Sequence, residues 1–171
     1  MPEETMSVRL PHRYLVELAE RMKRNTAHTR RAQLGDIDVV YGVYKGDNET
    51  AGIIGCYDES GNIFVVEDLF RLDPQFADLV AYHEFLEVTY KQTGNSHARA
   101  HRRAIVGELL AARASLGDPV RLHAYVSWRI GAYPAVKVPD PDIVIEQLEK
   151  LLLHDRVRKG RLLEVITRHM L

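Results

Sequence analysis

Residues 81–101 read AYHEFLEVTYKQTGNSHARAH, and this stretch predicts two helices joined by a tight turn. Apolar side chains recur at helical spacing before and within its first half. Residues 93–95 include a glycine and are typical of a helix end, and Ser96 is a favourable cap for the next helix. Because the connection is short, the two helices are expected to form an antiparallel hairpin.

Polar side chains of this hairpin are predicted to meet at one place. His83 and Glu87 lie four residues apart, so they project from the same helix face and continue its apolar stripe inward. Counting outward from the turn puts His101 opposite Glu87, whereas His97 falls opposite the end of the first helix. A buried carboxylate is costly without a partner, and a bound cation removes that cost. We therefore predict a metal site of His83, Glu87 and His101, with His97 as the alternative third ligand.

Further side chains near this site have predicted roles. Glu84 lies about 100° around the helix from its neighbouring histidine and is not needed as a ligand. Its carboxylate is therefore free to take a proton from a water held by the ion. Glu108, two turns beyond His101, is expected to be an additional ligand or an acceptor that orients an imidazole. Tyr90 or His97 is expected to stabilise an oxyanion.

The His83-Glu84 pair resembles the start of the HExxH motif of the zincin metallopeptidases, and Glu87 stands where that motif has its second histidine. The resemblance covers residues 37–110 as an order of elements. It implies that His83 is a zinc ligand, that Glu84 is the general base and that an edge strand, at Ile63–Val66, binds an extended peptide. Zinc accepts mixed His and Glu ligands, and the added carboxylate also suits manganese or iron.

The rest of the chain predicts an α+β fold with a small twisted sheet. Helical spacing of apolar residues marks the helices, and runs rich in valine, isoleucine and tyrosine mark the strands. The predicted elements are a helix at 11–25, strands at 37–45, 51–57 and 62–66, helices from 73 to the 93–95 turn, from 96 to 117 and at 121–130, and two final helices at 142–154 and 160–170.

We predict a single zincin-like domain over residues 1–171. It comprises an amino-terminal helix within 1–35, a sheet with the metal-site helices within 36–117, and a helical extension over 118–171. The basic run from Arg21 to Arg31 is expected to be a solvated helix face followed by a loop. The apolar stripes at 143–153 and 162–170 either finish the core or form a dimer contact, and the oligomeric state stays open.

Composition narrows the class of protein. The 171 residues carry a net charge of -1, which argues against a chain built to coat nucleic acid. Cys56 is the single cysteine, so the chain has neither an internal disulfide nor a cysteine-based zinc motif. An acidic leader and the lack of a long apolar run predict a cytoplasmic protein without a membrane segment.

The function expected from these features is a metal-dependent hydrolase, specifically a zincin-like peptidase acting on a peptide or protein. The rival from another class is a non-catalytic zincin-like module that binds a metal or another protein. A nucleic-acid-associated regulator is the third alternative.

Overall fold

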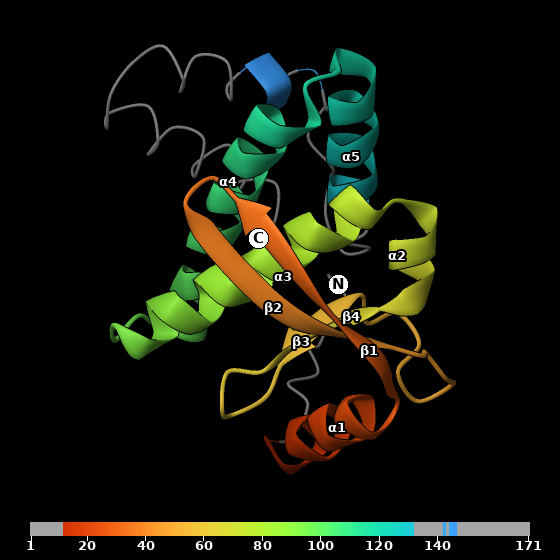
Figure 1. The fold of residues 1–171 in the computed structure, drawn as a ribbon. Coiled ribbons are helices and arrows are strands. Elements are labelled where there is room, and N and C mark those ends of the chain that lie inside the picture. Colours follow the sequence, from red (N-terminus) through yellow and green to blue (C-terminus); the bar gives the residue numbers. More distant parts are fainter. Residues whose placement is uncertain (1–11, 132–141, 143, 147–171) are drawn as a thin grey trace, which may run out of the picture.

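The computed structural model describes residues 12–131, 142 and 144–146. It confirms an α+β fold with a small open sheet and several helices (Figure 1). The elements are α1 (His12–Arg24), β1 (Thr26–Leu34), β2 (Ile37–Tyr44), β3 (Gly55–Tyr57), β4 (Ile63–Val66), α2 (Glu67–Leu72), α3 (Pro74–Gln92), α4 (His97–Leu116) and α5 (Pro119–Gly131). The two final helices predicted at 142–154 and 160–170 lie outside the described residues, apart from residues 142 and 144–146, which are helical.

The sheet has the strand order β1-β2-β4-β3. Strands β1 and β2 are antiparallel, β2 and β4 are parallel, and β3 pairs antiparallel with β4. The prediction that Ile63–Val66 is an edge strand is therefore wrong, because β4 lies between two neighbours and β3 forms the edge. Ile63, Phe64 and Val65 are all buried, and such an unbroken apolar run is typical of an interior strand.

Strand β1 was not predicted, because residues 26–34 are largely polar and were expected to be a loop. They form a hairpin with β2 across Gly35 and Asp36, and Gly35 has a positive φ of 63°. A two-residue Gly-Asp connection is a recognised hairpin signal. Within β1, Arg30 binds Asp78 of α3 through two contacts of 2.8 and 3.0 Å. Part of the basic run is thus engaged in fixing the hairpin to α3.

The predicted helix boundaries around the site are confirmed. Asp73 caps α3 by accepting a hydrogen bond from the Gln75 backbone, and Pro74 follows at the first helical position. Ser96 caps α4 in the same way, accepting from the Arg99 backbone. The short helix α2, between β4 and α3, was not predicted.

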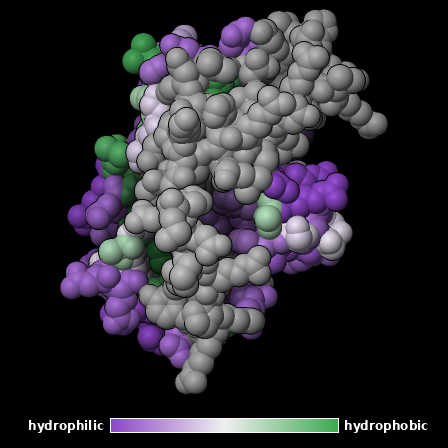
Figure 2. Space-filling model, turned by 180° about the vertical axis from the view of Figure 1, so that it is seen from behind, coloured by the Kyte–Doolittle hydropathy of each residue, from purple (hydrophilic) through white to green (hydrophobic). Residues whose placement is uncertain are grey.

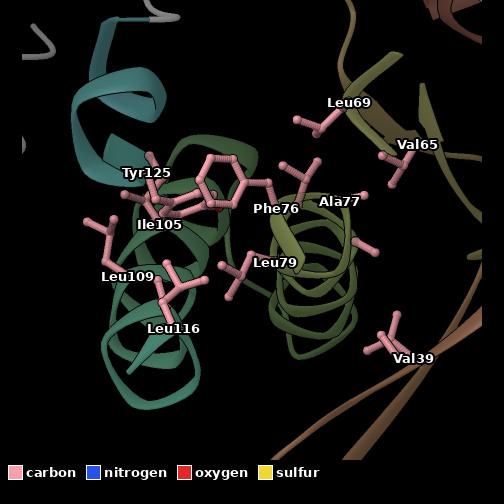
Figure 3. Packing of buried hydrophobic residues seen from close by; sticks show 14 of the residues in the cluster. Val39, Val65, Leu69, Phe76, Ala77, Leu79, Ile105, Leu109, Leu116 and Tyr125 are labelled. Carbon is pink, nitrogen blue, oxygen red and sulfur yellow. The ribbon is translucent and has the colours of Figure 1, made fainter. Parts of the chain in front are cut away.

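Helix α3 is packed on two sides. One side rests on the sheet, and the other rests on α4 and α5, as Figures 1 and 3 show. Its buried residues therefore lie on more than one face of the helix rather than along one narrow stripe. The core residues labelled in Figure 3 come from the sheet and from the helices on this side of it. They are Val39 and Val65 of the sheet, Leu69 of α2, Phe76, Ala77 and Leu79 of α3, Ile105, Leu109 and Leu116 of α4, and Tyr125 of α5.

Helix α1 covers the opposite face of the sheet. Leu18 and Met22 pack with Tyr44 and Phe64, whose side chains alternate with those facing α3. Cys56 is partly buried and packs against this second cluster. No helix within the described part of the chain is both long and apolar enough to cross a bilayer. Hydrophilic residues make up most of the described surface visible in Figure 2.

Candidate metal centre

The structure brings His83, Glu87 and His101 together at the crossing of α3 and α4. His83 and Glu87 have side chains only 1% and 4% exposed, while the His101 side chain is 29% exposed. His83 Nε2 lies 3.1 Å from His101 Nδ1, and His101 Nδ1 lies 2.8 Å from Glu87 Oε2. One ligand atom from each residue fits within 4.8 Å of the others, so the group can hold a metal ion.

The chemistry of these three atoms favours a shared cation. Each of them can carry a lone pair, and bare lone pairs at such distances repel one another. His83 Nε2 is also 3.5 Å from Glu87 Oε2, so no atom of the trio is remote from the other two. Protons on the histidines relieve the repulsion in the ion-free protein. A single bound cation relieves it for all three atoms at once.

Glu87 uses its two oxygens differently. Oε2 faces His83 and His101, whereas Oε1 lies 2.9 Å from His97 Nδ1 and accepts a hydrogen bond of 2.9 Å from the Tyr57 hydroxyl. The His97 side chain is 73% exposed, so it contacts the outer oxygen from the solvent side. The geometry therefore favours His101 over His97 as the third ligand.

Tyr57 was missed in the sequence. It reaches Glu87 from the edge strand β3, thirty positions earlier in the chain. No local pattern signals such a contact, because it depends on how β3 packs against α3. Tyr90, which was predicted to help at the site, instead lies under the Arg103 guanidinium, 4.6 Å from its ring centre.

Glu108 lies behind His83, away from His101. It is fully buried, and its Oε2 is 2.8 Å from His83 Nδ1, although the direction of approach is not that of a regular hydrogen bond. Arg129 binds both Glu108 oxygens, at 2.7 and 3.1 Å, and the Tyr125 hydroxyl donates to Oε1. Of the two predicted roles for Glu108, this position fits an acceptor that orients an imidazole.

The charges around His83 perturb several pKa values. Burial lowers the pKa of His83, but Glu108 and Glu87 raise it more, to about 9. Burial likewise raises the pKa of Glu87, but contacts with His101, His83 and His97 hold it well below its ordinary range. For Glu108, burial is outweighed by Arg129 and His83, which lower its pKa to about 2. Both carboxylates are therefore ionised at neutral pH.

Glu84 is placed differently from the ligands. It is half-buried, and its Oε1 lies 3.2 Å from the point where a Cβ on Gly55 would sit. No side chain among the described residues forms a hydrogen bond or ion pair with it. Burial raises the pKa of Glu84 to about 7, with further upward contributions from Glu87 and a downward one from His83. A carboxylate with that pKa exchanges protons readily near neutral pH.

Gly55 sets how closely β3 approaches α3. A Cβ there would come within 2.7 Å of Val80 Cγ1 in addition to crowding Glu84. We expect Gly55→Val to destabilise the fold by about 1–3 kcal/mol, because overpacking forces the strand away from the helix. Gly55→Ala should cost less. Urea unfolding of the parent protein and of both variants measures these losses of stability. Equal stability of Gly55→Val and the parent protein would contradict the close approach of β3 to α3.

Lys91, the other histidines and two aromatic residues lie outside the ligand group. Lys91 Nζ lies 5.2 Å from the centre of the Tyr57 ring. His28 rests against Phe70, and His123 faces Asp142. His12, His154 and His169 have no described side chain. Tyr125 and Trp128 pack at the core, both against Phe76.

The site cannot be assigned by similarity. A scan of the chain against protein-family models, a search of curated proteins and a search of solved structures all find no match.

Proposed function

We propose that this protein binds one divalent metal ion through His83, Glu87 and His101 and acts as a zincin-like hydrolase on peptides or proteins. The observation that carries the proposal is the convergence of three ligand atoms within 4.8 Å, beside a carboxylate whose pKa is about 7. Two imidazoles and a carboxylate form a donor set known from catalytic zinc sites. The carboxylate also makes manganese and iron suitable ions.

A bound ion of this kind supplies Lewis-acid polarisation and makes water a better nucleophile. The chain's own groups account for the rest. His83, Glu87 and His101 hold the ion, and Glu84 accepts the proton of the attacking water. Tyr57 and His97 keep Glu87 in place through its outer oxygen, and they are the donors that we assign to an oxyanion.

The order of elements supports the likeness to zincins. An edge strand, β3, precedes the helix with His83 and Glu84, and the third ligand follows on the next helix. Gly55 of β3 lies against Glu84, and Tyr57 of β3 contacts Glu87. An extended peptide that paired with the outer edge of β3 would therefore pass beside the proposed base.

A first test is the metal content of the protein. When the full chain is purified without chelators, elemental analysis is expected to find about one zinc, manganese or iron ion per chain. Because the pKa of His83 is about 9 in the ion-free protein, binding displaces a proton from it at neutral pH. The affinity for added Zn²⁺ should thus fall by roughly tenfold for each pH unit below that value.

Two results would contradict the metal site. One is a protein that neither retains an ion nor binds added Zn²⁺, Mn²⁺ or Fe²⁺ in calorimetry. The other is binding that does not weaken as the pH falls, since this would exclude histidine ligands. Chelator-treated protein that is reloaded with the ion serves as the control for damage during purification.

One observation favours a second candidate function, a non-catalytic metal-binding module that acts through a protein partner. The network around the site joins four elements, because Tyr57 lies on β3, His83 on α3, Glu108 on α4 and Arg129 on α5. An ion at its centre would also serve to fix these elements together. The two candidates differ in the role of Glu84, which is needed only for hydrolysis.

A further inference from the structure

We infer that Arg129 and Tyr125 of α5 are positioning residues for the metal site. They hold the Glu108 carboxylate against one nitrogen of His83, so that the other nitrogen faces Glu87 and His101. This inference rests on the proposed metal binding and extends it to a helix that supplies none of the three ligands.

Glu108 is fixed by a fully formed set of donors. Its side chain is completely buried, and the Arg129 guanidinium binds it in a two-pronged contact of 2.7 and 3.1 Å. Such a fork determines the plane of a carboxylate as well as its position. The Tyr125 hydroxyl donates to Oε1, which leaves Oε2 as the oxygen nearest to His83.

The position of Glu108 determines how the His83 ring is used. His83 Nδ1 is buried and lies 2.8 Å from Glu108 Oε2, a charge contact rather than a regular hydrogen bond. With Nδ1 turned to that carboxylate, Nε2 is the nitrogen 3.1 Å from His101 and 3.5 Å from Glu87. A carboxylate behind a metal-binding imidazole fixes its tautomer and orientation. The ligand arrangement therefore depends on α5 through Glu108.

Stability alone gives little reason for this arrangement. Buried ion pairs on average gain little over apolar side chains of similar size, because desolvation offsets the attraction between the charges. Yet Arg129 is only 5% exposed and Tyr125 and Glu108 are not exposed at all. Arg129 and Tyr125 both bind Glu108, and Glu108 alone contacts the His83 imidazole. The same helix carries Arg121, which pairs with the Asp73 carboxylate at 2.6 Å and touches none of the site residues. Arg121 thus provides a matched control on α5.

The test uses Co²⁺ as the probe, because its visible absorption reports both affinity and ligand geometry. Arg129→Met in the full chain is expected to raise the dissociation constant for Co²⁺ by about ten- to hundredfold and to alter the absorption spectrum. Tyr125→Phe should raise the constant by roughly three- to tenfold, the loss of one hydrogen bond. Arg129→Lys, which keeps the charge, should recover part of the affinity. Arg121→Met should leave the affinity and the spectrum unchanged.

Thermal unfolding of each variant separates positioning from folding. If Arg129→Met does not fold, Tyr125→Phe and Arg129→Lys decide the question. Unchanged Co²⁺ affinity and spectrum in these variants, with normal binding by the parent protein, would overturn the inference and leave the proposed metal site intact. If the parent protein itself binds no Co²⁺, the metal site and this inference both fail.

Discussion

Replacing His101 by alanine is expected to weaken Zn²⁺ binding by about a hundredfold or more, whereas His97→Ala should weaken it by about tenfold at most. Structural zinc sites bind with roughly 10–16 kcal/mol, so each of four ligands accounts for about 3 kcal/mol, or a factor of a hundred. His101 Nδ1 belongs to the trio of ligand atoms. His97 contacts the outer oxygen of Glu87 and stacks with the His101 ring at 6.2 Å between ring centres, so its loss acts indirectly on the ligand set.

Competition with a chromophoric chelator at one fixed pH measures these affinities. His101 suits the experiment because it is partly exposed, whereas removing the buried His83 would take one partner from both Glu87 and Glu108 in the protein interior. His28→Ala is the matched control, since His28 is exposed and packs against Phe70 away from the site. If His97→Ala lost more Zn²⁺ affinity than His101→Ala, His97 would be the third ligand, and the assignment of His101 to that role would be contradicted.

Periodicity and short connections made much of this site predictable. The four-residue spacing of His83 and Glu87 fixes both on one face of α3, whatever else the fold does. The turn after α3 is so short that α4 has to run back along it, which brings His101 level with Glu87. Local cap signals at Asp73 and Ser96 also fixed the starts of both helices.

Contacts between elements that are distant in the chain could not be predicted from the sequence in this way. Tyr57 and Arg129 reach the network from a three-residue strand and from the last turn of α5. Their roles depend on the packing angles of β3 and α5, which residue spacing within one element does not encode. Strand β1 was missed for a different reason: its polar residues cover an exposed edge, and the signal lay in the Gly35-Asp36 turn.

Electrostatics was also only partly predictable. Spacing showed that Glu84 lies off the helix face that bears the ligands, but its pKa is raised by burial, which spacing within α3 does not encode. The strand beside Glu84 is β3, an edge strand of the sheet, and not β4 as predicted.

Glu84→Gln is expected to abolish hydrolysis while leaving metal binding intact. The amide keeps the size of the side chain but accepts no proton, and loss of a general base lowers kcat/KM by about 10²–10⁴-fold. Cleavage of a mixed peptide library, followed by mass spectrometry, measures the loss. In the parent protein, kcat/KM should rise as the pH passes through about 7, because Glu84 acts as a base only when ionised. The variant should lack this rise.

The metal content decides how a loss of activity is interpreted. Because Glu84 makes no contact with His101 or His97 among the described hydrogen bonds and ion pairs, Zn²⁺ affinity in Glu84→Gln should stay within about threefold of the parent value. Glu67→Gln, which removes a carboxylate paired with Arg71 on α2, is the matched control and should keep full activity. Full hydrolysis by metal-loaded Glu84→Gln would exclude Glu84 as the base. A metal-loaded parent protein that cleaves no peptide in the library would instead favour the non-catalytic module, in which Glu84→Gln also leaves binding to a protein partner unchanged.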